Sequence, residues 1–171
     1  MHEWRITKYD PAGRDAAGVY QRDEWTSVAD VGRVIGGRLV TWEEVRAVED
    51  AYVAAAVRFM QESQVTVLRA VDVEGPSPGR DPGLPWADLL YAGPPLRAGT
   101  MLDRPEVERA IRLNLRELQW CRLVAPRRFF LHFGWDYYMY LGSSRACPAA
   151  VAYARGLGLF VEPWPSPYRR R

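Results

Sequence analysis

The chain has 171 residues, which is the size of one domain with its own hydrophobic core. Hydrophobic residues make up 48% and aromatic residues 12% of the sequence, so the composition excludes general disorder. The 23 basic and 21 acidic residues give a net charge of only +2, which argues against a dedicated nucleic-acid-binding protein. No run of apolar residues is long enough to span a membrane, so we expect no membrane partner.

The cysteine content and the N-terminus both predict a cytoplasmic protein. Two cysteines are too few for the disulfide framework of a secreted protein, and the first six residues, MHEWRI, do not resemble a signal peptide. The chain contains only His2 and His132 and no Cys-x-x-Cys pair, so we expect no metal site. The segment 32–37 lacks the Lys-Ser/Thr of a phosphate-binding loop, and we expect no cofactor.

The first predicted elements are a strand and a short helix. Residues 4–9 alternate and are rich in aromatic and β-branched side chains, which indicates a strand with Trp4 and Ile6 on one face. Ser27 is a suitable N-cap for a short helix over 28–35, which the following glycine pair would end.

A long amphipathic helix is predicted over 41–63. Thr41 and Glu44 have the spacing of a capping box, in which each side chain satisfies a free backbone N–H. Glu49 and Asp50 fall on the polar face, where we expect them in water. The apolar residues behind the cap recur at steps of three and four, and the face expected to meet the core contains Val45, Val48, Ala51 or Tyr52, Ala55 and Phe59.

The next segments predict a strand, a long connection and a second main helix. Residues 65–71 are β-branched and indicate a strand. The connection 74–99 carries six prolines and five glycines, with a short helix predicted to begin at Pro85. A helix follows from 103 to about 118, with arginines such as Arg112 and Arg116 expected to face water.

The remainder of the sequence is rich in predicted strands. Three aromatic runs, 120–124, 128–133 and 137–141, are separated by short connections, which favours an antiparallel meander. A helix over 147–155 and a last strand over 159–162 follow. The sequence thus predicts a single α+β domain spanning 1–171, with an antiparallel sheet of about five or six strands and two main helices packed on one face.

One possible catalytic arrangement involves a cysteine and a histidine. If Pro126 and Arg127 are the two central residues of a hairpin turn, Cys121 and His132 oppose each other and can form a thiolate–imidazolium pair. Asp136 lies just past the strand and is placed to orient the imidazole. The alternative interpretation is that both are core residues, since free cysteine is commonly a small buried hydrophobe. We favour this alternative and assign no catalytic residue.

The aromatic block 129–140 is the densest feature of the sequence. On alternating strands it supplies rings to both faces of the sheet, one packed on the helices. The other face either exposes Tyr and Trp side chains or is covered by the connection 74–99. Exposed aromatics near arginine are typical of protein interfaces. The candidate partner-binding residues are Trp86, Tyr91, Arg127, Arg128, Trp135 and Tyr138.

Three segments carry a resemblance to other proteins. WRITKYDP at 4–11, DEWTS at 23–27 and FGWDYYMY at 133–140 resemble a recurring pattern of small single-domain bacterial proteins of the toxin-immunity type. The resemblance spans nearly the whole chain, and the Pro/Gly-rich region 74–99 departs from it as an insertion. It implies a protein partner, such as a toxin domain, and transfers no catalytic residue.

The sequence therefore predicts a cytoplasmic protein-binding domain, an immunity protein that neutralises a bacterial toxin by occluding its active site. Two alternatives stay open at this point. One is a small enzyme that uses the Cys121/His132 pair, and the other is a homo-oligomeric structural subunit whose exposed sheet face forms a homodimer. A toxin-like gene in the adjacent reading frame would favour the first interpretation, and a metabolic operon would favour the enzyme.

Overall fold

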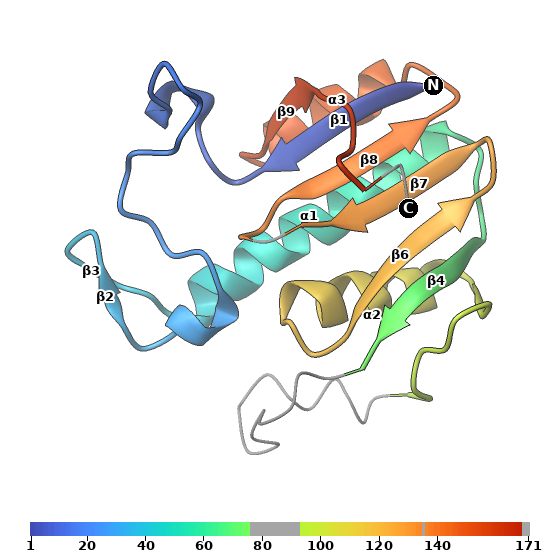
Figure 1. Cartoon of the computed structure of the whole chain (residues 1–171), viewed down its shortest axis with the longest axis horizontal. Coiled ribbons are helices and arrows are strands. Elements are labelled where there is room, and N and C mark those ends of the chain that lie inside the picture. The colour runs from blue at the N-terminus through green and yellow to red at the C-terminus, as the bar shows by residue number, and fades with distance from the viewer. Residues whose placement is uncertain (76–92, 135, 169–171) are drawn as a thin grey trace.

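The centre of the molecule is a seven-stranded antiparallel sheet (Figure 1). The computed structural model describes residues 1–75, 93–134 and 136–168. The predicted α+β class and the antiparallel sheet are confirmed, although the sheet has more strands than the five or six expected. Its strands, in spatial order, are β5 (Met101–Leu102), β4 (Leu68–Glu74), β6 (Trp120–Ala125), β7 (Phe129–Phe133), β8 (Met139–Ser143), β1 (His2–Thr7) and β9 (Phe160–Pro163).

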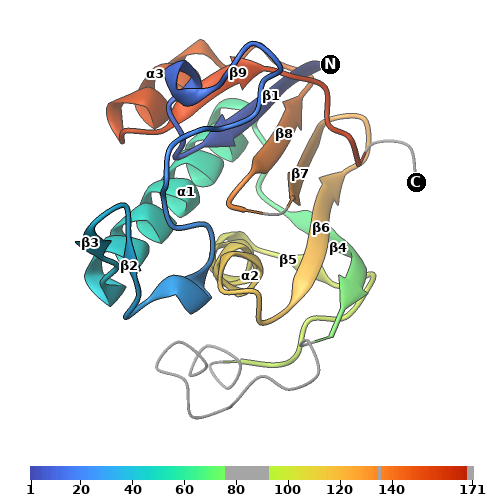
Figure 2. The ribbon, with the colours of Figure 1, turned by 60° about the vertical axis from the view of Figure 1, so that its left-hand side comes forward.

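Three α-helices cover one face of this sheet (Figures 1 and 2). The two long helices correspond to the predicted main helices, and the shorter third one to the predicted helix over 147–155. They are α1 (Trp42–Glu62), α2 (Arg104–Leu115) and α3 (Pro148–Gly156). α1 packs against both α2 and α3, so it lies in the middle of the helical layer. In the described ranges, no helix combines the length and the apolar character needed to cross a membrane.

The apolar face of α1 forms the centre of the core, as predicted. Tyr52 and Phe59 have no exposed surface, and the Phe59 ring lies 5.1 Å from the ring of Trp4 on β1. The Thr41 hydroxyl caps the helix by accepting a hydrogen bond from the backbone N–H of Glu44 at 3.2 Å. The other expected bond of the capping box, from the Thr41 backbone N–H to the Glu44 carboxylate, was predicted wrongly. The Glu44 carboxylate instead accepts a hydrogen bond from the indole N–H of Trp25.

The helix predicted over 28–35 is wrong. Only the 3-10 turn η2 (Val28–Asp30) forms there, capped by Ser27 as expected. The chain then makes a small hairpin of β2 (Val34–Ile35) and β3 (Arg38–Leu39). Its two turn residues are glycines with φ of 58° and 77°, the left-handed pair that a tight hairpin favours. The glycine pair therefore turns a hairpin rather than ending a helix.

Two charged residues expected in water between α1 and α2, Glu49 and Arg116, are instead buried and paired, whereas Arg112 is half-buried and Asp50 is exposed as expected. Glu49 has no exposed surface, and the Arg116 side chain is only 8% exposed. Arg116 donates two hydrogen bonds to Glu49, at 2.7 and 2.9 Å, and Arg112 donates one more. We call Glu49, Arg112 and Arg116 the Glu49 cluster. The sequence did not predict this cluster, because helical periodicity places its three residues on the polar faces of α1 and α2. Only the packing of α2 on α1 excludes water from these side chains.

The predicted meander of β6, β7 and β8 is confirmed, but the turn between β6 and β7 is one residue longer than expected. Ala125 pairs with Phe129, which leaves three loop residues instead of two. Arg128 N–H donates to the Ala125 carbonyl, and Arg127 has a φ of 63° behind Pro126, as the third position of a type II turn requires. This shift of one residue decides which side chains share a face.

The second face of the sheet, which we call the outer face, is crossed by the C-terminal segment 164–168 (Figure 1). Trp164 N–H donates to the Glu3 carbonyl at 3.1 Å, and Ser166 N–H donates to the Glu3 carboxylate at 3.0 Å. The Arg5 guanidinium lies 3.8 Å from the centroid of the Trp164 ring. This short C-terminal segment therefore covers part of the face. The cover suggested by the sequence, the connection 74–99, lies mostly outside the described residues, since 76–92 are not described.

Candidate functional site

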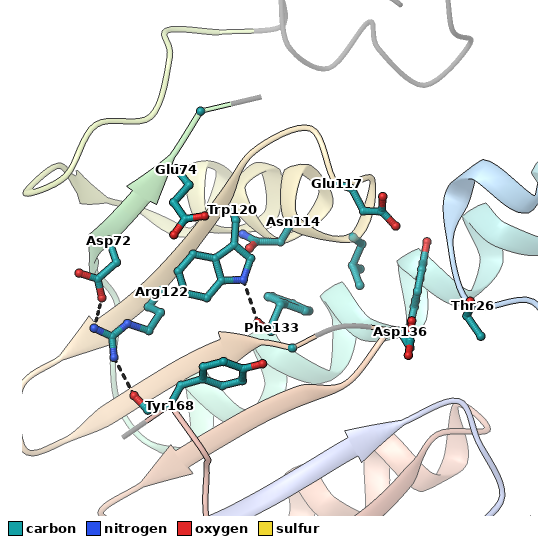
Figure 3. Close-up of a pocket in the computed structure, with 14 residues that line it drawn as sticks. Thr26, Asp72, Glu74, Asn114, Glu117, Trp120, Arg122, Phe133, Asp136 and Tyr168 are labelled. Carbon is teal, nitrogen blue, oxygen red and sulfur yellow. Dashed lines mark hydrogen bonds and ion pairs between the residues drawn. The ribbon is translucent and has the colours of Figure 1, made fainter. Parts of the chain in front are cut away.

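A cavity of about 610 Å³ lies where the outer face meets the end of α2 (Figure 3). The ends of β4 and β7, the start of β6 and the turn between β7 and β8 all meet there. Its volume falls in the range of roughly 300–1,000 Å³ that is typical of ligand sites. Its chemically distinctive lining consists of four carboxylates and four aromatic rings, namely Asp72, Glu74, Glu117, Asp136, Trp120, Phe133, Tyr137 and Tyr168.

The indole of Trp120 forms the central wall of the cavity. Its N–H donates to the Phe133 carbonyl on β7 at 2.8 Å, which fixes the orientation of the ring. Glu74 on β4 is the register partner of Trp120 and lies beside it, while the Tyr168 ring lies 6.3 Å away (Figure 3). Two strands and the C-terminal segment thus place a carboxylate and two rings around one space.

The end of α2 supplies the next part of the wall. Asn114 holds this end against β6, since its amide oxygen accepts from the Cys121 N–H at 3.1 Å. Glu117 follows with a φ of 53°, at the position after a helix where glycine is usual. Its N–H donates to the Asn114 carbonyl at 2.9 Å, and its carboxylate accepts from the Ser27 hydroxyl at 2.6 Å. A carboxylate therefore occupies a backbone position that favours glycine.

Tyr137 closes the cavity from the turn between β7 and β8. The hydroxyl of Tyr52 donates to the Tyr137 carbonyl at 2.5 Å, and the rings of Tyr137 and Trp25 pack in a T-shaped arrangement with centroids 5.0 Å apart. Tyr137 is only 4% exposed, and its own hydroxyl has no hydrogen-bond partner among the described residues. A buried hydroxyl without a partner costs about 1–3 kcal/mol, so it is an exception that calls for an explanation.

Left-handed backbone conformations are concentrated at this cavity. In the described parts of the chain, seven residues other than glycine have a positive φ, and four of them line the cavity. These conformations cost about 1–3 kcal/mol each in residues with a side chain, and they cluster at functional sites in proteins. The four are Asp72, Glu117, Asp136 and Tyr137.

The cavity carries a surplus of negative charge. Its one basic lining residue among those described, Arg122, pairs with Asp72 and donates to the Tyr168 carbonyl at 2.8 Å. Four carboxylates and one guanidinium leave a formal charge of −3. As Figure 3 shows, the ion pair lies at one end of the cavity, while Glu117 and Asp136 lie at the other. The cavity thus combines aromatic surface with an acidic lining.

The structure does not bring Cys121 and His132 together, so the expected cross-strand pairing is wrong. Leu123 pairs with Leu131, and continuing this register places His132 opposite Arg122. Cys121 faces the helices, where the Asn114 amide lies 3.4 Å from its Sγ. Burial raises the pKa of the Cys121 thiol to about 11, although the Asn114 hydrogen bond opposes the shift. This environment disfavours the thiolate that a nucleophile needs.

His132 lies on the outer face beneath the C-terminal segment. Its ring stacks on Phe130 at 4.5 Å, and its Nδ1 lies 3.1 Å from the Ser166 hydroxyl. Burial, with a smaller effect of the Arg122 charge, lowers the pKa of His132 to about 4. Asp136, expected to orient this imidazole, is exposed and lines the cavity instead.

The structure describes three of the predicted partner-binding residues, and these lie at opposite ends of β7. Arg127 and Arg128 are exposed at the β6–β7 turn, which is the opposite end of β7 from the cavity. Tyr138 is half-buried beside the cavity turn and packs against Tyr9, with ring centroids 5.6 Å apart. The remaining predicted residues lie outside the described part of the chain, namely Trp86, Tyr91 and Trp135.

Sequence reasoning missed Glu74, Glu117, Trp120 and Tyr168 as a group. They come from four separate segments, and no spacing in the chain connects them. The sequence carried no signal for Glu117, because the predicted helix runs to about 118 and includes it, whereas α2 ends at Leu115.

No group of three or more His, Cys, Asp and Glu side chains in the described ranges is arranged to hold a metal ion. Comparison of the chain with protein-family models, curated proteins and solved structures gave no match.

Proposed function

We propose that this chain is a protein-binding domain of the toxin-immunity type, which uses the acidic, aromatic cavity to engage its partner and occlude the partner's active site. The observation that carries the proposal is the acidic lining of a cavity walled by aromatic rings, with four carboxylates and one guanidinium among the described residues. Aromatic side chains at a partly open pocket are the usual anchors of protein interfaces. A negative surface also steers a positively charged partner during association.

The partner expected from this chemistry is a toxin domain with a basic active-site cleft. Substrates such as nucleic acids require a positive cleft, and a carboxylate-rich surface competes for it by charge complementarity. The cavity residues sit on a rigid base, because hydrogen bonds fix the Trp120 indole and the Tyr137 backbone. A rigid surface loses little conformational entropy when a partner binds.

The test is neutralisation of the protein encoded by the adjacent reading frame. In a bacterial host, that product expressed alone should arrest growth, and co-expression of this chain should restore it. Absence of toxicity, or toxicity that this chain does not relieve, would contradict the proposal.

Charge-reversed variants locate the surface. The double variant Glu74→Lys/Asp136→Lys should lower the affinity for the purified toxin at least about tenfold, because it reverses two of the surplus charges. Glu43→Lys is the matched control, since Glu43 is an exposed carboxylate that does not line the cavity. Equal affinity of all three proteins by titration calorimetry would remove the cavity from the interface.

A further inference from the structure

The C-terminal segment 164–168 is attached to the outer face by few backbone hydrogen bonds. Its two prolines have no backbone N–H, and two of its three other N–H groups, those of Trp164 and Ser166, donate to Glu3 on β1. Trp164 and both prolines are exposed. A segment with few hydrogen bonds and little buried surface opens at a lower cost in free energy than the sheet beneath it. We therefore expect this segment to open separately from the sheet.

His132 lies beneath this segment, and its contact with Ser166 depends on its charge state. His132 is only 3% exposed, and its Nδ1 lies 3.1 Å from the Ser166 hydroxyl. The Ser166 oxygen also accepts the Tyr168 N–H at 3.2 Å, which leaves the hydroxyl proton to be donated to an unprotonated Nδ1. Protonation would turn Nδ1 into a donor and deprive the hydroxyl proton of its acceptor.

The neighbouring groups make protonation of His132 unfavourable while the segment is in place. Arg122 on β6 lies opposite His132 and donates to the Tyr168 carbonyl, so protonation would place a second positive charge beneath the same segment. Burial, and to a smaller extent the Arg122 charge, lowers the pKa of His132 to about 4. Burial also raises the pKa of Tyr140, the register partner of His132 on β8, so this phenol is neutral. The remaining groups are the Tyr168 ring, the Glu3 carboxylate, which accepts from Ser166, and the Asp72 carboxylate, which pairs with Arg122.

We propose that the C-terminal segment is a pH-sensitive latch over the outer face, closed while His132 is neutral and released when His132 is protonated. An imidazolium ion regains water when the segment leaves, whereas a neutral imidazole loses its Ser166 hydrogen bond. Release also removes Tyr168 from the wall of the cavity. The latch goes beyond the proposed function, since it operates whether or not a partner binds.

The equilibrium constant for closing the latch should fall about twentyfold between pH 7 and pH 5. The closed latch holds the pKa of His132 at about 4, and opening returns it to the ordinary value of about 6.5. The open form therefore takes up a proton in this interval that the closed form rejects, so closing is favoured at pH 7 and weakened as the pH falls. The interval lies above the pH at which carboxylates ordinarily titrate.

Hydrogen exchange of the full chain, followed by NMR, measures the latch through the Ser166 amide, which donates to Glu3 across the attachment. After correction for the intrinsic exchange rate at each pH, protection of this amide should fall about twentyfold from pH 7 to pH 5. His132→Gln should abolish the decrease. His2→Gln is the matched control and should retain it, because His2 is exposed and stacks on Trp4, away from the outer face. A decrease that persists in His132→Gln, or that is absent from the unaltered chain, would overturn the proposal.

A sheet amide and a serine variant separate release of the latch from unfolding of the whole chain. The Leu131 amide on the central strand β7 should exchange at least about a hundredfold more slowly than the Ser166 amide at both pH values. Ser166→Ala removes the hydroxyl contact with His132 and should raise the opening constant about fivefold at pH 7. Ser144→Ala, at an exposed serine after β8, should leave it unchanged. Equal protection of the two amides, or an unchanged opening constant in Ser166→Ala, would overturn the proposal.

Discussion

The Glu49 cluster and the cavity lie on either side of the same helix end, yet they treat charge differently. Arg116 and Glu117 are adjacent in the chain, but Arg116 points into the Glu49 cluster and Glu117 lines the cavity. Glu49 is fully buried and shared by two guanidiniums, whereas the cavity holds four carboxylates and one guanidinium. A fully buried charge is tolerated only when it is paired. The buried carboxylate is thus paired where the helices pack, whereas the described lining of the cavity holds more carboxylates than guanidiniums.

The difference in packing between the two regions predicts the largest effect on stability. Phe59→Ala removes a fully buried ring from the helix-covered face and should lower the free energy of unfolding by about 4–5 kcal/mol. The upper part of the usual range applies because the contact with Trp4 at 5.1 Å is lost as well. Urea denaturation measures the change. A loss below about 1 kcal/mol would contradict the role of Phe59 as a core residue.

The Glu49 cluster should be nearly as sensitive. Glu49→Gln removes the carboxylate shared by Arg112 and Arg116 and should cost about 3 kcal/mol, because the almost fully buried Arg116 guanidinium loses its ion pair with Glu49. Glu74→Gln is the matched control at the cavity and should change stability by less than about 0.5 kcal/mol. Similar losses in the free energy of unfolding of the two variants would show that the Glu49 cluster and the cavity carboxylates do not differ in their structural role.

Thiol labelling tests the burial of the helix-covered face directly. Both Cys121 and Cys147 are buried and free, so a thiol probe should label neither in the native protein and both in urea. With the pKa of Cys121 raised to about 11, two pKa units above the 9.0 of a free thiol, about a hundredfold less thiolate is present at neutral pH. Rapid labelling of native Cys121 would instead support a reactive cysteine.

The outer face should show its own pH dependence through His132. Because burial lowers its pKa from 6.5 to about 4, the unfolded chain binds a proton that the folded chain rejects. This contribution to stability is full above about pH 6.5 and is lost as the pH falls towards 4. It amounts to about 2 kcal/mol between pH 7 and pH 5. The free energy of unfolding of His132→Gln should fall by correspondingly less than that of the wild-type protein over this interval. An identical decrease in the two proteins would contradict a lowered pKa of His132.

The smallest expected effect on stability is at the cavity. Asp136→Asn removes a surplus charge but keeps a residue type that tolerates its φ of 58°. The free energy of unfolding should change by less than about 0.5 kcal/mol in either direction. If thermal unfolding instead showed a loss of several kcal/mol, the carboxylate would have a structural role like that of Glu49.

The local features of the fold could be predicted from the sequence because they depend on neighbouring residues. The α1 helix follows from the periodicity of its apolar residues and from the Thr41 cap. The start of α2 follows from the capping box of Asp103 and Glu106. The order of β6, β7 and β8 follows from the short connections between them.

The register and the cavity were decided only by the tertiary structure. One extra turn residue placed Cys121 and His132 on opposite faces. Pro126 disfavours a two-residue turn, because proline cannot adopt the positive φ needed at its first position, but it does not fix the length of a longer turn. The pairing of Glu49 with Arg116 required α2 to pack on α1 and exclude water. The cavity gathers side chains from β4, α2, β6, the β7–β8 turn and the C-terminal segment. Its acidic lining is therefore a property of the assembled sheet, because its four carboxylates come from β4, the end of α2 and the β7–β8 turn, and none of these segments supplies more than two.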